Sequence, residues 1–203
     1  MCQLAVYCLI LYYFMEPISD NLVTIYAEAT PNPESMKFVS SKMLLPNDSA
    51  DFRTAESAAD SELAKALFEM PFVKGVFIMN NFVSITKNNE YEWFDLIPDL
   101  RAFFQEWIQD GKSIVLYKKR MSAEEESAVE RKIRQLLEDH VRPAVEMDGG
   151  AIDFKSYQNG IVTVQMKGSC SGCPSSTMTL KAGIENLLKR MVPEVQSVEA
   201  EAG

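Results

Sequence analysis

Two cysteines at C-x-x-C spacing lie between a strand pattern and a helix pattern near the end of the chain. The strand pattern covers 161–167, and the helix pattern runs from Pro174 to about Arg190. Cys170 and Cys173 therefore lie on a strand-to-helix turn. Proline suits the first turn of a helix, and the partial positive charge at a helix N-terminus stabilises a thiolate. The pattern predicts an exposed pair of thiolates, available to a metal or for redox chemistry.

The pair supplies half of the protein ligands that a tetrahedral zinc site or a common iron–sulfur cluster needs. The other cysteines, Cys2 and Cys8, lie at the extreme N-terminus, and His140 is the only histidine. We expect His140 at a helix end rather than on a metal. The spacing alone leaves three interpretations open: a redox dithiol, a metal site completed by a second chain, and a structural or incidental pair.

Further motifs surround the cysteines in a fixed order. They are Arg142-Pro143, Asp148-Gly149-Gly150, and the segments 160–164, 168–176 and 179–185. From Val141 to Leu188 the chain thereby resembles the NifU-like C-terminal domain of the Nfu family of iron–sulfur scaffolds. The resemblance implies a [4Fe–4S] cluster shared between two subunits, with a [2Fe–2S] cluster as the alternative. It implies that Cys170 and Cys173 of each subunit are the ligands.

The resemblance also implies a scaffold or carrier rather than an enzyme. Incoming thiolates of a client can replace the scaffold's thiolates stepwise. The implied partners are a second copy of the chain, bound through the cluster, an upstream cluster donor, and apo iron–sulfur client proteins. The alternatives are a thiol–disulfide oxidoreductase that uses the Cys170/Cys173 dithiol and a zinc-bridged structural dimer. Against the redox alternative, no aromatic residue leads into Cys170 and the flanking pattern is not a thioredoxin-like βαβ unit.

The first half of the chain has the pattern of a separate α+β domain. Strand patterns cover 22–28, 36–39, 76–79 and 82–86, and helix patterns cover 58–70 and 93–108. The order ββαββα predicts an antiparallel sheet with helices packed on it. We expect 46–57 to form a polar loop, Pro98 to break the second helix, and Phe94 to face the core. Thr30-Pro31-Asn32-Pro33, followed by Met36-Lys37-Phe38, resembles the N-terminal domain of many Nfu proteins.

The second half predicts an α-β-β-α domain. Ser122 is expected to cap its first helix, with Glu125 completing a capping box. Asn159-Gly160 is typical of a two-residue hairpin turn, and 195–199 of a last short strand. The predicted fold class is therefore α+β with two small domains. The predicted boundaries are 15–112 for the Nfu N-terminal domain, 113–121 for a linker and 122–203 for the NifU-like domain.

Residues 1–14 are almost wholly apolar and contain no lysine or arginine. A helix that spans a bilayer needs about 20 apolar residues. Signal peptides carry basic residues near their start, and mitochondrial transit peptides are rich in arginine. We therefore expect residues 1–14 to be a doubtful extension in front of Met15 as the initiator, and we expect no membrane association.

The net charge of −9 is shared by both halves, and the only basic run is Lys118-Lys119-Arg120. Nucleic-acid binding is disfavoured because contacts to phosphates need a positive surface. Four cysteines are too few for a disulfide framework, which indicates a reducing compartment. From these properties we predict a cytoplasmic protein.

Overall fold

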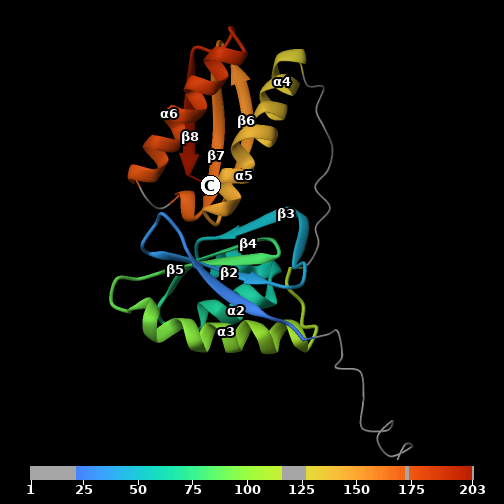
Figure 1. Cartoon of the computed structure of the whole chain (residues 1–203), viewed down its shortest axis with the longest axis vertical. Helices are drawn as coiled ribbons and strands as arrows, with labels where there is room; N and C mark the ends of the chain where they lie inside the picture. Colours follow the sequence, from blue (N-terminus) through green and yellow to red (C-terminus); the bar gives the residue numbers. More distant parts are fainter. Residues whose placement is uncertain (1–21, 116–126, 172–173, 203) are drawn as a thin grey trace, which may run out of the picture.

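A five-stranded antiparallel sheet forms the first domain of the computed structural model, which describes residues 22–115, 127–171 and 174–202. The strand order is β1-β2-β5-β4-β3. Their bounds are Ile25–Ala29 for β1, Ser35–Ser40 for β2, Leu45–Phe52 for β3, Val73–Asn80 for β4 and Phe82–Lys87 for β5. The helices are η1 (Glu56–Asp60), α2 (Glu62–Phe68) and α3 (Trp93–Gln109). In Figure 1, α2 and α3 lie below the sheet, and the second domain lies above it.

The central strands of this sheet are buried on both faces. Alternate side chains of a strand point to opposite faces, so Phe38, Ile78 and Ile85 join the core between the sheet and its helices. The opposite face carries a separate small apolar cluster of Val39, Phe77, Met79 and Phe82, which also includes Ala151 of the second domain. The sheet therefore has two packed faces, one against its own helices and one against the second domain.

Three expectations for the first domain were wrong. The predicted loop 46–57 contains most of β3, which pairs with β4 as an edge strand with a register shift between Leu45 and Ser49. Its middle is polar because an edge strand can expose side chains while its backbone is paired on one side. The helix α3 runs through Pro98 without a break, because packing of its buried residues offsets one missing hydrogen bond. Phe94 is 88% exposed and does not face the core.

The second domain is a three-stranded sheet with helices. Its helices are α4 (Ala128–Leu136), the π-helix η2 (Leu137–Val141), α5 (Arg142–Met147), η3 (Ser169–Ser171) and α6 (Pro174–Met191). Its strands are β6 (Gly150–Gln158), β7 (Ile161–Gly168) and β8 (Ser197–Ala202). The hairpin β6–β7 turns at Asn159 and Gly160, whose φ angles of 52° and 82° confirm the predicted turn. The last strand, β8, pairs in parallel with β7.

The first helix of this domain begins later than predicted. Ser127 is its N-cap, and Glu130 completes a capping box with it. The predicted cap, Ser122 with Glu125, lies outside the described residues. The same Ser-x-x-Glu pattern occurs twice in this stretch, so the pattern alone could not distinguish the two serines.

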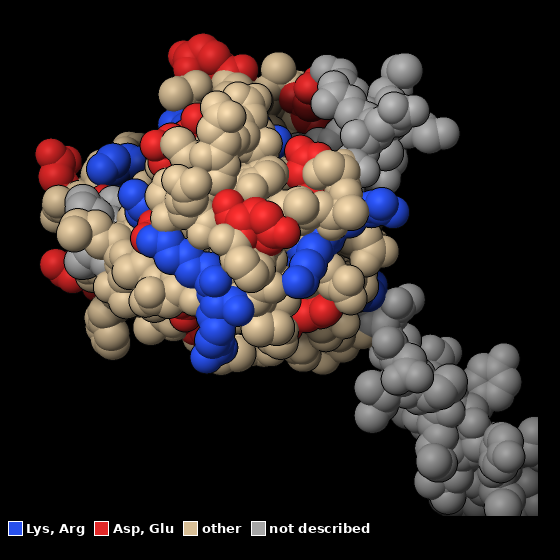
Figure 2. Space-filling model, turned by 90° about the horizontal axis from the view of Figure 1, so that it is seen from above, with Lys and Arg blue, Asp and Glu red and all other residues tan. Residues whose placement is uncertain are grey.

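Charged side chains of both signs cover the surface. On the face that Figure 2 shows, basic and acidic side chains lie interspersed. Such a face does not form the continuous positive surface that phosphate contacts need. Within the part of the chain that the structure describes, no helix has the length and apolar character required to cross a membrane.

Candidate functional site

Cys170 lies in η3, on the turn between β7 and α6, where the sequence pattern predicted it. Hydrogen bonds hold this turn on both sides. The Thr177 hydroxyl donates to the Cys170 carbonyl at 3.0 Å, and the Ser171 hydroxyl donates to the Gly168 carbonyl at 2.8 Å. Cys173, the second predicted ligand, lies outside the described residues.

The thiol of Cys170 is buried, so the prediction of an exposed thiolate is wrong for this residue. The residue is 6% exposed and belongs to the apolar core of the second domain. Burial raises the pKa of Cys170 to about 11, and the nearby Asp148 carboxylate adds to this rise. Cys170 precedes α6 instead of lying in its first turn, where the stabilisation of a thiolate by the helix dipole is concentrated. In this conformation the thiol keeps its proton at neutral pH.

Two glycines allow close contacts at this site, one with the sulfur of Cys170 and one with the first domain. A Cβ added at Gly150 would lie 2.7 Å from Cys170 Sγ and 2.7 Å from the Lys167 carbonyl. A Cβ added at Gly149, where φ is +76°, would lie 2.7 Å from Ser84 Oγ of the first domain. The two glycines of the Asp148-Gly149-Gly150 motif thus have different neighbours: the cysteine for Gly150 and the first domain for Gly149.

A cavity of about 350 Å³ opens beside Cys170 at the junction of the two domains. It is lined by Pro31, Asn32, Asp148, Ser169, Cys170, Thr179 and Leu180. Burial raises the pKa of Asp148, while the positive charge of Lys37 opposes that rise. Because Pro31 and Asn32 belong to the first domain, one side of the cavity comes from that domain, although both predicted cluster ligands belong to the second.

The first domain reaches the cysteine turn through the Thr30–Pro33 segment. The Asn32 side chain, which is buried, donates from Nδ2 to the Ser169 carbonyl at 3.3 Å. Its Oδ1 accepts a hydrogen bond from the Glu34 N–H at 3.0 Å, which holds the side chain in a turn. From the sequence, this segment showed only a resemblance to the N-terminal domain of many Nfu proteins. The contact joins residues that are 137 positions apart, so no local pattern could reveal it.

His140 is exposed and lies in the last turn of η2, which continues directly into α5. Among the residues that the structure describes, no group of three or more histidine, cysteine, aspartate and glutamate side chains is placed to hold a metal ion. A metal or cluster at Cys170 therefore needs ligands from outside the described residues, such as Cys173, or from another chain.

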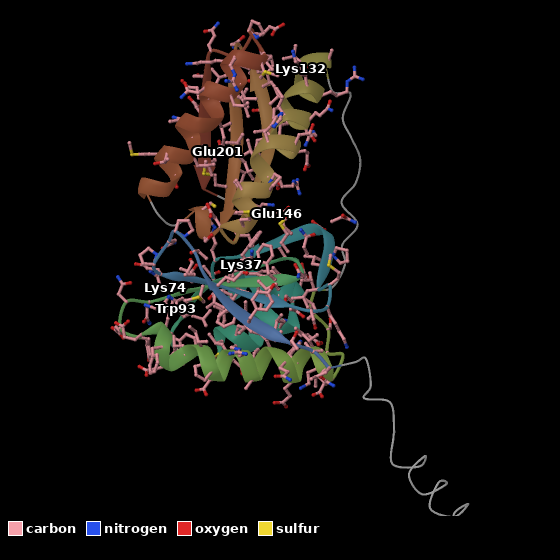
Figure 3. The ribbon with its side chains drawn as sticks, in the orientation of Figure 1. Lys37, Lys74, Trp93, Lys132, Glu146 and Glu201 are labelled. Atoms are coloured by element: carbon pink, nitrogen blue, oxygen red, sulfur yellow. The ribbon has the colours of Figure 1, made fainter. Side chains whose placement is uncertain are left out.

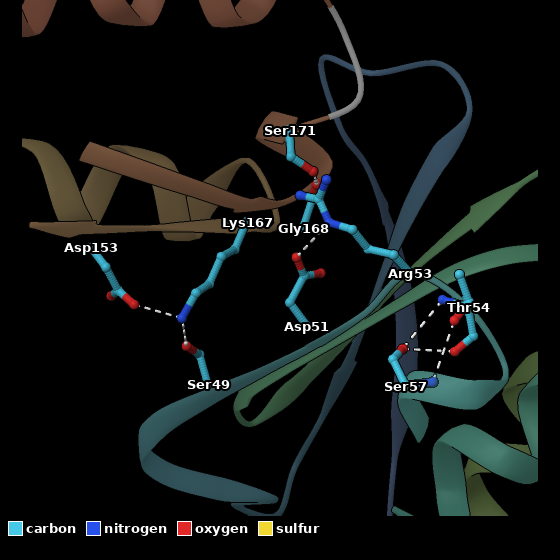
Figure 4. A network of polar contacts seen from close by, with 9 residues as sticks. All are labelled: Ser49, Asp51, Arg53, Thr54, Ser57, Asp153, Lys167, Gly168 and Ser171. Carbon is cyan, nitrogen blue, oxygen red and sulfur yellow. Dashed lines mark hydrogen bonds and ion pairs between the residues drawn. The ribbon is translucent and has the colours of Figure 1, made fainter. Parts of the chain in front are cut away.

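A polar network flanks the cysteine turn on the side of β3. Lys167 Nζ lies 2.5 Å from Asp153 Oδ2 and donates to Ser49 Oγ at 3.3 Å, so it joins β7 to the first domain (Figure 4). Nearby, Arg53 Nε lies 3.2 Å from Asp51 Oδ2. Arg53, Gly168 and Ser171 line one side of a further cavity of about 280 Å³.

Comparison with protein-family models gives two matches. The model described as the N-terminal domain of the scaffold protein Nfu/NifU matches residues 25–111, and that of the NifU-like domain matches residues 133–199. The human NFU1 iron–sulfur cluster scaffold homolog, a mitochondrial protein, is 39% identical over 190 residues, which cover 92% of this chain and 74% of that protein. NifU-like protein 5 of Arabidopsis thaliana, also mitochondrial, is 40% identical over 185 residues, covering 87% of this chain and 67% of that protein.

A solved structure is also similar to part of the chain. The solution structure of a NifU-like protein from Saccharomyces cerevisiae aligns with a TM-score of 0.44 at 23% identity, covering 49% of this chain and 90% of that chain.

The prediction of a cytoplasmic protein is wrong. Both relatives named above, and NifU-like protein 4 of Arabidopsis thaliana, are mitochondrial proteins. The prediction used the small number of cysteines, which separates reducing from oxidising compartments but not one reducing compartment from another. It also used the absence of basic residues in 1–14, which lie outside the described residues.

Proposed function

This chain belongs to the Nfu family of iron–sulfur cluster scaffold proteins, and from that premise we propose that it holds a [4Fe–4S] cluster between two subunits and transfers it to apo-proteins. The cluster is cargo, and the chain carries it without turnover of a small substrate. Cys170 and Cys173 of each subunit supply the four thiolates that such a cluster requires. The site of action is the mitochondrion, as in the named relatives.

One observation carries this proposal. Cys170 lies on a glycine-rich turn beside a cavity, and the described residues around it offer no set of metal ligands. A thiol placed in this way needs other sulfurs to complete a tetrahedral iron site. The predicted domains 15–112 and 122–203, joined by 113–121, are part of the same proposal, with the cluster on the second domain.

Transfer follows from ligand exchange at iron. A client thiolate forms a new S–Fe bond while the bond between iron and a scaffold cysteine breaks. The released scaffold thiolate takes up a proton, and the oxidation state of the cluster does not change. Repetition at each iron moves the cluster to the client.

The redox alternative uses the same dithiol, and both functions need Cys170 as a thiolate, so its raised pKa does not separate them. The redox alternative is disfavoured by the flanking sequence, which is not a thioredoxin-like βαβ unit. A zinc-bridged dimer uses the same cysteines, but zinc gives no visible colour. The measured ratio of iron and sulfide to protein distinguishes a [4Fe–4S] cluster from the alternative, a [2Fe–2S] cluster.

Anaerobic reconstitution with iron and sulfide tests the proposal. We expect about four iron and four acid-labile sulfide ions per dimer, and their loss in both Cys170→Ala and Cys173→Ala. The matched control, Cys2→Ala/Cys8→Ala, makes the same substitution at the other two cysteines and is expected to load normally. A colourless protein that takes up zinc, or one that forms a reversible internal disulfide in place of a cluster, would contradict the proposal.

A further inference from the structure

The second domain rests on the face of the first sheet that α2 and α3 do not cover. Ala151 of β6 is buried there against Val39, Phe77, Met79 and Phe82. Lys37 and Ser84 are paired across β2 and β5, so they point to this same face. The Ser84 hydroxyl donates to the Gly149 carbonyl at 2.6 Å, and Lys37 Nζ donates to the Met147 carbonyl at 3.4 Å. The contact therefore combines an apolar centre with hydrogen bonds from the sheet.

Further polar contacts extend this junction. Asn80 Nδ2 donates to Glu146 Oε2 at 3.2 Å. Figure 3 shows Lys37 and Glu146 on the two sides of the junction, one on each domain. With the bond from Lys167 to Ser49, side-chain hydrogen bonds join the domains on more than one side of the apolar centre.

The cysteine turn, which joins β7 to α6, and the neighbouring turn between α5 and β6 both fit this face closely. A Cβ at Gly168 would lie 2.8 Å from the Phe77 ring, and one at Gly149 would lie 2.7 Å from Ser84 Oγ. The backbones of these two turns therefore approach the sheet more closely than turns with side chains at these positions could. Such complementarity is the property of a specific docking contact rather than of two domains that touch incidentally.

Asn32 extends the contact to the cysteine turn. Its hydrogen bond to the Ser169 carbonyl places the first domain against the residue that precedes Cys170. Pro31 and Asn32 line the same cavity as Cys170 and form its wall on the side of the first domain. A second chain that approached Cys170 from this side would meet the first domain.

We infer that the uncovered face of the N-terminal sheet is a docking surface for the chain's own cysteine turn, and that docking closes the cluster site. This inference rests on the proposed function, because a cluster shared by two chains needs both turns to be accessible. The two domains separate when the turn receives a cluster or delivers it. The N-terminal domain thereby sets how readily Cys170 is reached.

A pair of substitutions in the first domain tests the closure. Asn32→Asp keeps the side-chain oxygen that holds the turn and removes the donor to Ser169, and Ser84→Ala removes the donor to Gly149. The matched control is Asn88→Asp/Ser57→Ala. Asn88 makes the same kind of turn, accepting from the Glu90 N–H at 3.2 Å and donating to the Pro71 carbonyl at 3.3 Å, and Ser57 donates to Thr54 at 2.7 Å.

The readout is the rate at which Cys170 is alkylated. It is measured in a Cys173→Ser background, so that Cys170 is the one thiol in the tryptic peptide 168–181. Loss of two hydrogen bonds is expected to raise the rate roughly tenfold over the parent and the control. The added carboxylate of Asn32→Asp disfavours a thiolate, so an increase comes from opening and not from a change in charge. Solution X-ray scattering of the same proteins, which does not depend on the thiol, is expected to show a larger radius of gyration for the variant alone.

Unchanged alkylation together with unchanged scattering would overturn the closure. Wild-type protein that binds a cluster without any increase in the radius of gyration per subunit would also overturn it. In that case the first domain would stay docked and form a wall of the loaded site. These outcomes are separable from the proposed function. If the variant opens but no chain binds iron, the docking contact stands and the scaffold proposal fails.

Discussion

A Cβ at position 150 would lie 2.7 Å from Cys170 Sγ, so the glycine at this position determines where the sulfur can lie. Gly150→Ala forces the sulfur or the Lys167 backbone to move. We expect it to lower the free energy of unfolding by about 1–3 kcal/mol, as overpacking does. Urea denaturation of the apo-protein measures this. Gly183→Ala is the control, since an added Cβ there has no neighbour within 4 Å and alanine favours a helix; equal loss in both variants would contradict the prediction.

The buried thiol also predicts a dependence of stability on pH. The folded state holds the Cys170 proton up to about pH 11, whereas an ordinary thiol loses it near 9.0. This contribution to stability is complete below pH 9.0 and is lost as the pH rises toward 11. The difference in unfolding free energy between wild type and Cys170→Ala should therefore shrink over this range. A difference that stays constant or grows with pH would show that the thiol is not held in its protonated form.

The ion pair of Lys167 with Asp153 is expected to contribute to stability because the lysine side chain is only 7% exposed. Lys167→Ala should destabilise the protein by about 2 kcal/mol, less than for a fully buried pair because Asp153 is partly in solvent. Lys189→Ala removes an exposed pair with Glu185 of the same 2.5 Å length and should change stability by less than about 0.5 kcal/mol. Thermal or urea unfolding distinguishes the two, and similar effects would contradict this ranking.

The start of α4 offers a test of which serine caps the helix. Ser127→Ala removes the hydroxyl that accepts from the Glu130 N–H at 3.2 Å and should cost about 1 kcal/mol. Ser122→Ala makes the same change at the serine that we predicted as the cap and should leave stability unchanged. The reverse order, measured by urea denaturation, would place the helix start at the earlier serine.

Much of the fold could be predicted from local patterns. The turn at Asn159 and Gly160 depends on residues that tolerate positive φ, and it was recognised. The strand β3 was missed because Pro46, Asn47 and Asp48 have turn chemistry, while the pairing of β3 with β4 is a tertiary property. The two Ser-x-x-Glu patterns near α4 were equivalent in sequence and differ only in context.

The site was predicted less completely than the fold. The position of Cys170 on a strand-to-helix turn followed from periodicity and from Pro174. Its burial did not follow, because it depends on Gly150 and on the apolar core of the second domain, which other elements form. The contribution of the first domain to the cavity, through Pro31 and Asn32, could not be predicted either, because these residues lie far from Cys170 in the sequence. Cys173 remains a prediction, and the exposed thiolate that the helix dipole suggested is wrong for Cys170.

The native mass of the anaerobically reconstituted protein tests the central proposal most directly. Measured without denaturation, the protein should have the mass of two chains plus one [4Fe–4S] cluster, and removal of iron by a chelator should convert it to single chains. A reconstituted protein that carries its iron as a single chain would contradict a cluster shared between two subunits.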